Sequence, residues 1–170
     1  MKMKFITLTV LIMISLSLTA SANEDLMFAV GLYEDGNYTL AQQELVKYLA
    51  EYPQSDYRLE ASYLLADIYL EQKNYQQANE IFGKLSKTPP ATMPYSDILS
   101  GLGQSYYYLQ NYNEAIKVFT QLISKYPQDE QISRFYYFLG VSMIETGEFE
   151  LAEENLLMAM NIDDRVSVRL

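Results

Sequence analysis

The sequence contains no cysteine and no histidine among its 170 residues. These two absences exclude disulfide bonds, thiol nucleophiles, imidazole bases and the usual zinc ligands. Glycine and proline are scarce, with 7 and 5 copies, whereas aromatic residues make up 14% of the chain. Such a composition is typical of a globular chain rather than a disordered one, and we expect no metal site and no cofactor.

Motifs that carry catalysis are also missing from the sequence. It has no glycine-rich phosphate loop and no G-x-S-x-G turn around a nucleophile. Neighbouring carboxylates such as Glu153 and Glu154 do not form a pattern that predicts converging acid and base roles. We therefore expect a protein that is not an enzyme and has no catalytic residue.

Positive charge is in short supply. The chain has 12 Lys and Arg against 22 Asp and Glu, which gives a net charge of −10. An acidic surface repels phosphate backbones and anionic lipid headgroups, so nucleic acid is not an expected partner. Solubility is a sufficient explanation of the acidity.

The first 22 residues have the layout of a secretory signal peptide. Lys2 and Lys4 precede an apolar run over residues 5–18, and small residues follow at Ala20-Ser21-Ala22. A run of 14 residues is shorter than the roughly 20 that span a bilayer. We predict cleavage after Ala22, no membrane span in the mature chain, and a periplasmic or secreted location. An uncleaved anchor is the alternative, and the absence of cysteine excludes a bacterial lipoprotein.

One pattern recurs four times along the chain at intervals of 37 residues. Each copy has an aromatic residue, then alanine three positions later, then a large apolar residue four positions after the alanine. The aromatic column is Tyr38, Tyr75, Tyr112 and Phe149, and the large apolar column is Leu45, Phe82, Phe119 and Leu156. A period of this length indicates an array of one supersecondary unit.

Each repeat predicts two helices joined by a short turn. In the second repeat, apolar residues at three- and four-residue spacing predict helices over 57–72 and 75–85. The turn column is Gly36, Lys73, Gln110 and Gly147, and the next column, Asn37, Asn74 and Asn111, is expected to cap the second helix. The least regular linker, Thr88–Ser96, contains three prolines and is expected to be a rigid spacer, with a hinge as the alternative.

A column of small residues is expected to let paired helices approach closely. It consists of Ala29, Ala66, Gly103 and Gly140. The large residue before each one is expected to pack into the helix crossing, and this column consists of Phe28, Leu65, Leu102 and Leu139.

These columns resemble the signature of the tetratricopeptide repeat family. In the third repeat they are Leu102-Gly103, Tyr106, Tyr112, Ala115, Phe119 and Pro127. The resemblance implies an all-α fold, a right-handed α-solenoid of about four helix-turn-helix repeats over residues 23–164. The repeats would cover about 22–58, 59–95, 96–132 and 133–164, followed by a short tail over 165–170.

The repeat length suggests a narrower resemblance within that family, whose usual repeat has 34 residues. The three extra residues and phrases such as Tyr52-Pro53-Gln54-Ser55-Asp56-Tyr57 are similar to bacterial envelope members, for example the Tol–Pal-associated cell division coordinator. That resemblance implies an exported, non-catalytic scaffold that binds protein partners of the cell envelope. A periplasmic component of polysaccharide export is the alternative.

In this family the first helices line a concave groove, and their residues outside the signature columns face it. This mapping predicts a tyrosine-rich site formed by Tyr33, Tyr63, Asp67, Leu70, Gln104, Tyr107, Tyr108, Tyr137 and Val141. Such a surface suits a protein or peptide partner, either extended or helical, although stacking on sugar rings is also open. The mapped positions contain no cluster of basic residues, which disfavours an acidic tail as ligand.

The C-terminal helix is a second candidate surface. It carries Leu156, Leu157, Met158, Met160 and Ile162, and no amphipathic helix that could cap the array follows in the sequence. Exposed apolar patches mark interfaces. We therefore expect self-association through this helix, a partner, or a longer natural chain.

Overall fold

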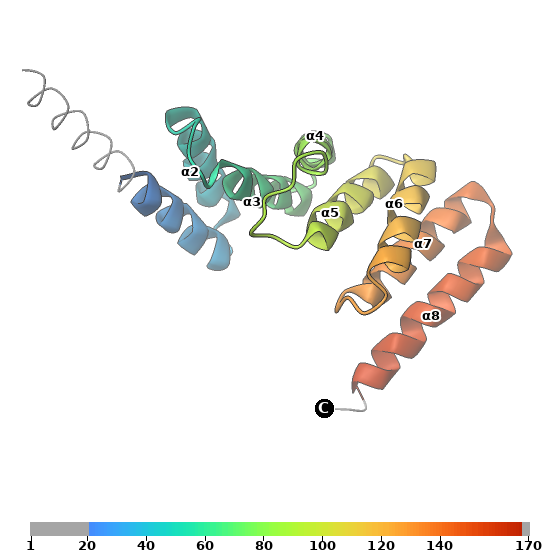
Figure 1. Cartoon of the computed structure of the whole chain (residues 1–170). Helices are drawn as coiled ribbons and strands as arrows, with labels where there is room; N and C mark the ends of the chain where they lie inside the picture. Colours follow the sequence, from blue (N-terminus) through green and yellow to red (C-terminus); the bar gives the residue numbers. More distant parts are fainter. Residues whose placement is uncertain (1–20, 168–170) are drawn as a thin grey trace, which may run out of the picture. The chain divides into compact units, whose positions relative to one another are not determined.

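Every regular element in the described part of the chain is a helix (Figure 1). The computed structural model describes residues 21–167, with side chains described through residue 162. Residues 21–34 form the first described helix. The helices that follow are α2 (Tyr38–Glu51), α3 (Arg58–Glu71), α4 (Tyr75–Leu85), α5 (Tyr95–Tyr108), α6 (Tyr112–Lys125), α7 (Ile132–Thr146) and α8 (Phe149–Ser167). The two helices predicted for the second repeat agree with α3 and α4 to within one residue at each end.

The described helices begin within the predicted signal peptide and end within the predicted tail. The predicted signal peptide over 1–22 lies outside the described residues except for Ser21 and Ala22, which belong to the first described helix. The last helix runs to Ser167, so it includes the first three residues of the segment expected as a tail. In the described part of the chain, no helix combines the length and apolar character needed to cross a bilayer.

The turn inside each repeat has the same hydrogen-bonding pattern in all four copies. The turn of the third repeat, which follows α5, illustrates the pattern. There Gln110 N–H donates to Tyr107 O at 2.9 Å and Asn111 N–H donates to Tyr106 O at 2.9 Å. This pair of bonds is a Schellman motif, which requires a left-handed residue just past the helix. That residue comes from the predicted turn column, with φ of 73° at Gly36, 64° at Lys73, 62° at Gln110 and 85° at Gly147.

The predicted asparagine caps are right in position and wrong in mechanism. Asn37, Asn74 and Asn111 are the N-cap residues of α2, α4 and α6, but none of their side chains makes a capping hydrogen bond. Their backbone N–H groups instead close the preceding helix through the Schellman motif. The column therefore marks the turn, and its asparagine side chains do not stabilise the next helix in the usual way.

The chain divides into two compact units, Met1–Ile68 and Tyr69–Leu170, which we describe separately. In the first unit, small residues such as Ala29 and Ala41 and the large side chains of Leu45 and Tyr48 are buried. The Tyr52 hydroxyl, just past the end of α2, donates to Asp25 Oδ2 at 2.6 Å. This bond ties the end of the first repeat to the first described helix.

In the second unit, large side chains of one helix fill spaces left by glycines of a neighbouring helix. A Cβ on Gly103 would lie 2.8 Å from Phe119 Cζ, and one on Gly140 would lie 2.7 Å from Leu156 Cγ. The small-residue column therefore does what the sequence predicts. Gly101 was not part of that column, yet a Cβ there would overlap the ring of Phe82.

The column of large residues packs as predicted in three repeats and not in the first. Leu65, Leu102 and Leu139 are at most 7% exposed, whereas Phe28 is 59% exposed. The difference has a physical reason, since the face of the first described helix that carries Phe28 has no described helix beyond it.

The proline-containing linker is tied to its surroundings within the second unit. The Tyr95 hydroxyl donates to Ser86 O at 3.0 Å, which joins the two ends of the linker, and Pro90 is buried. The Lys125 ammonium lies 5.1 Å from the centre of the Tyr95 ring. These contacts favour the spacer over the hinge.

Candidate functional site

The predicted site residues of the first unit lie together. The Tyr33 hydroxyl, on the first described helix, donates to Asp67 Oδ2 on α3 at 2.5 Å. The Tyr33 ring also lies against Tyr38, with centroids 5.7 Å apart. Burial and then the bond to Asp67 raise the pKa of Tyr33 well above its ordinary value, with a smaller contribution from Tyr63.

This pairing limits what the first unit can offer a partner. Tyr33, Tyr63 and Asp67 are all half-buried. Because the Tyr33 hydroxyl proton is already shared with the Asp67 carboxylate, a ligand would have to compete with a charge-assisted hydrogen bond. In the free protein the pair mainly fastens the first described helix to α3.

Two predicted site residues of the second unit are buried instead of facing a partner. Leu70 is 8% exposed and Gln104 is 5% exposed. The Gln104 amide is satisfied internally, since Nε2 donates to Ser100 Oγ at 3.1 Å and Oε1 accepts from Arg134 Nη2 at 2.6 Å. The prediction that Leu70 and Gln104 line the site is therefore corrected, because both belong to buried helix faces.

The three predicted tyrosines of the second unit gather around Phe138. Tyr107 and Tyr137 meet Phe138 edge to face, with ring centroids 5.5 and 5.4 Å apart. Tyr108 also contacts Phe138 at 6.2 Å and stacks on Tyr75 at 4.5 Å with planes 12° apart. We call Tyr75, Tyr107, Tyr108, Tyr137 and Phe138 the aromatic cluster.

The aromatic cluster has a buried base and an exposed edge. Phe138 is 5% exposed, whereas Tyr108 and Tyr137 are 43% and 50% exposed. Burial raises the pKa of the Tyr107 and Tyr108 hydroxyls, so both stay protonated near neutral pH. Val141, the remaining predicted residue, is half-buried one turn beyond Tyr137 on α7. The cluster therefore presents aromatic faces and neutral hydroxyls on a firm hydrophobic base.

Arg134 lies beside the aromatic cluster and is a candidate site residue that the sequence analysis did not include. Its guanidinium bonds to Gln104 and lies 5.9 Å from the centre of the Phe138 ring, and it lowers the pKa of Tyr108 slightly against the effect of burial. A signal was present, since Arg134 is the only basic residue of α7 and precedes Phe138 by four positions, on the same helix face.

Tyr75 and Phe138 were also left out of the predicted site, for a different reason. Tyr75 lies in a signature column, and residues of these columns were not expected to face the groove, yet its ring stacks on that of Tyr108. Phe138 occupies the position of Leu64 and Gly101 in earlier repeats, so its ring has no counterpart from which to infer it. Among residues 21–162, no group of three or more acidic side chains is placed to hold a metal ion.

The repeated helix pairs and their shared turn define a helical repeat protein. Two models of the tetratricopeptide repeat match the sequence, one over residues 32–96 and the other over residues 96–129. Together they cover more than half of the 170 residues, and the chain belongs to the tetratricopeptide repeat family.

Solved structures with the same fold include MamA from MSR-1 and from AMB-1. The first has a TM-score of 0.70 and 18% identity, over 85% of this chain and 78% of that chain. The second has a TM-score of 0.69 and 18% identity, over 84% and 73%. A putative kinesin light chain of Podosopora anserina has a TM-score of 0.68 and 16% identity, over 86% and 76%. A search of the curated proteins finds no significant match.

These likenesses show the fold, an all-α helical repeat of the tetratricopeptide type. Repeats of this type are typically non-catalytic scaffolds for protein–protein interaction. The chain is therefore a scaffold by class, and the surface it uses is the remaining question.

Proposed function

We propose that this chain is an exported scaffold of the bacterial cell envelope that captures a protein partner on the aromatic cluster of its second unit. The observation that carries the proposal is the grouping of Tyr107, Tyr108 and Tyr137 around Phe138, with Arg134 at its side. Tyrosine and arginine dominate the energetics of protein interfaces, where a few residues supply most of the affinity.

The geometry of the cluster favours a peptide segment that combines an apolar side chain with a carboxylate. Exposed rings of Tyr108 and Tyr137 offer apolar faces that are already held in place, so little side-chain entropy is lost on binding. Gln104 holds Arg134 at one side of these rings, and a guanidinium keeps further donors for a carboxylate. An extended or helical segment of a partner protein meets these requirements.

Export is supported by the sequence of the first 22 residues. The charged start, the apolar run over 5–18 and the small residues at Ala20-Ser21-Ala22 together form the signal layout. Cleavage after Ala22 would remove Ser21, whose Oγ lies 3.2 Å from the Tyr52 hydroxyl, and keep the stronger bond from Tyr52 to Asp25. The narrower resemblance to the Tol–Pal-associated coordinator stays a prediction.

Site-specific photocrosslinking in living cells tests the partner. A photoreactive phenylalanine analogue would replace Tyr108 or Tyr137 in the cluster, and Gln121, an exposed residue of α6, would be the control position. We expect discrete protein adducts from positions 108 and 137 that are absent from position 121. Adding Arg134→Ala to either crosslinking chain should weaken the adduct.

Three outcomes count against the proposal. Equal adducts from all three positions would mean that the cluster is not the binding surface. Capture of glycan without protein, lost when Tyr108 and Tyr137 are replaced by alanine, would favour the polysaccharide-export alternative. A first residue other than Asn23 in the protein recovered from the periplasm, read by mass spectrometry, would contradict the predicted cleavage.

A further inference from the structure

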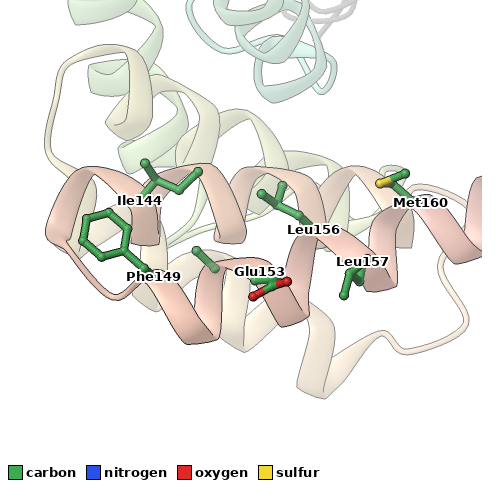
Figure 2. Close-up of a pocket in the computed structure, with 7 residues that line it drawn as sticks. Ile144, Phe149, Glu153, Leu156, Leu157 and Met160 are labelled. Atoms are coloured by element: carbon green, nitrogen blue, oxygen red, sulfur yellow. The ribbon is translucent and has the colours of Figure 1, made fainter.

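The last two helices leave an apolar depression at one end of the second unit. It has a volume of about 360 Å³ and is lined mainly by α8 side chains, with Ile144 contributed by α7 (Figure 2). Phe149, Leu157 and Met160 are 63%, 51% and 62% exposed. Such a patch of large apolar side chains is unusual on a surface that faces only water.

The repeat register shows what covers this face elsewhere in the second unit. Leu156 stands where Phe119 stands one repeat earlier and Phe82 two repeats earlier. The Phe119 ring stacks on Phe138 of α7, with centroids 5.3 Å apart and planes 8° apart. The Phe82 ring fills the space beside Gly101 of α5. In each case the second helix of one repeat is covered by the first helix of the next repeat.

The first described helix exposes the surface that, in later repeats, covers the second helix of the preceding repeat. We call this contact between consecutive repeats the internal junction. Met27 is in register with Gly101 and Phe138, 74 and 111 residues later, and Phe28 is in register with Leu102 and Leu139. All four counterparts are buried, whereas Met27 and Phe28 are 69% and 59% exposed. The first unit thus exposes a helix face of the kind that the depression on α8 is built to receive.

We infer that the first described helix of one copy docks on α8 of a second copy, so that copies join head to tail. Each such contact repeats the internal junction, with Met27 of one copy against Leu156 of the other, as Phe138 lies against Phe119. The two faces differ and every copy has both, so the contact is heterologous and propagates into a ring or a filament.

At the position of Glu153, charge favours this pairing over a symmetric contact between two α8 helices. Glu153 lines the depression, and a two-fold contact there would bring two carboxylates together in a chain of net charge −10. In the internal junction two repeats earlier, the residue equivalent to Glu153 is Asn79. Its side chain donates a hydrogen bond to Ser105 on the covering helix at 3.0 Å. Ser105 is in register with Gly31, which has open space beside its Cα and carries no charge.

A mixing experiment separates these arrangements. One variant carries Met27→Lys and Phe28→Lys, and the other carries Leu157→Lys and Met160→Lys. All four side chains are exposed, so both variants should keep the thermal unfolding curve that the original chain shows at concentrations too low for assembly. The full chain is purified with whatever N-terminal processing occurs, and mass is followed by sedimentation velocity over a concentration series.

We expect the original chain to form species larger than a dimer whose mass rises with concentration. Each variant alone should be a monomer, and an equimolar mixture of the two should form a one-to-one dimer, because the mixture contains one intact copy of each face. Glu24 stands where Ile98 and Phe135 stand in later repeats, so Glu24→Leu should tighten the assembly at least several-fold.

Other outcomes overturn the inference. A dimer of the Met27→Lys, Phe28→Lys variant, with no gain on mixing, would show a symmetric contact through α8. A monomeric original chain whose melting temperature falls on Leu157→Lys and Met160→Lys would show that another part of the same chain covers the depression. A chain that stays monomeric at every concentration, with unchanged variants, would show that neither face is an interface between copies.

Discussion

The ring of Phe82 on α4 occupies the space in which a side chain on Gly101 of α5 would have to lie. The ring is fully buried, so it cannot turn out into solvent to make room. A glycine at this position therefore permits the close approach of two consecutive repeats.

Gly101→Ala should consequently destabilise the protein, although alanine is the better helix former. Overpacking a tight junction typically costs about 1–3 kcal/mol. The expected result is a lower urea midpoint with an unchanged denaturant slope. Adding Phe82→Leu should recover part of the loss, because the smaller side chain leaves room for the new methyl group.

Gly83→Ala, on the same helix as Phe82, is the matched control. No atom lies within 4 Å of a Cβ built there, so the substitution should stabilise α4 by roughly 0.5–1 kcal/mol through helix propensity alone. If Gly101→Ala and Gly83→Ala changed the free energy of unfolding equally, the contact between Phe82 and position 101 would not affect stability.

A second prediction concerns the two turns whose left-handed residue is not glycine. Lys73 and Gln110 have φ of 64° and 62°, a conformation that strains a side chain by roughly 1–2 kcal/mol. Both side chains are exposed and their removal breaks few contacts. Lys73→Gly and Gln110→Gly should each raise stability by about 0.5–1 kcal/mol after the extra entropy of glycine in the unfolded chain is deducted.

The equivalent turn of the fourth repeat provides a control at Gly147. Its φ of 85° belongs to the same Schellman motif, and nothing lies within 4 Å of a Cβ there. Gly147→Ala should therefore destabilise for conformational reasons alone, in the opposite direction to Gln110→Gly. Differential scanning calorimetry that found both substitutions neutral would exclude the left-handed turn as a source of strain.

The sequence predicted those features that repeat with the 37-residue period. The helix pairs of the second repeat, the turn column and the buried columns at Ala41 and Leu45 all follow from residues that recur in register. Periodicity is informative here because equivalent residues of each repeat pack in the same environment. The same residue type therefore recurs at that position in every repeat.

The candidate site was only partly predictable, because it is built from residues that do not repeat. The positions equivalent to Arg134 in earlier repeats hold the acidic residues Asp97 and Glu60. The position equivalent to Phe138 one repeat earlier holds Gly101. Gln104 was assigned to the surface from its helical position, but its bond to Arg134 and its burial depend on what the neighbouring repeat supplies. Contacts between repeats of different sequence cannot be read from the columns alone.

A third prediction follows from the bond between Arg134 and Gln104. Arg134→Ala would leave the Gln104 carbonyl oxygen without its donor in a side chain that is 5% exposed. An unsatisfied buried polar group costs about 1–3 kcal/mol, and we expect a loss in that range. Arg134→Lys keeps the charge without the planar fork and should recover only part of it.

A double-mutant cycle with Gln104→Met isolates the pair from other effects of Arg134. If the bond is the source of the loss, Arg134→Ala should cost much less in the Gln104→Met background, giving a coupling energy of about 1 kcal/mol or more. A coupling energy near zero in urea unfolding would assign the effect of Arg134 to its packing on Phe138 instead.

The last prediction concerns alkaline pH and the pairing of Tyr33 with Asp67. Burial and this hydrogen bond hold the pKa of Tyr33 far above its ordinary value of 10.0. In the unfolded chain Tyr33 releases its proton near that ordinary value, whereas in the folded chain it keeps the proton. The folded state then binds more protons than the unfolded state, so stability must fall as pH rises above 10.0. Below that value the contribution of Tyr33 to stability is fully present and does not change with pH.

Unfolding in urea at about pH 8 and about pH 11 measures this loss, and Tyr33→Phe removes the ionisable group while keeping the ring. Tyr33→Phe should be less stable than the original chain at the lower pH, since it leaves Asp67 without its donor. The variant should lose less stability between the two values, so the difference between the chains narrows as pH rises. A difference that stayed constant would mean that Tyr33 titrates alike in the folded and unfolded states, which contradicts a hydroxyl held by burial and by the Asp67 carboxylate.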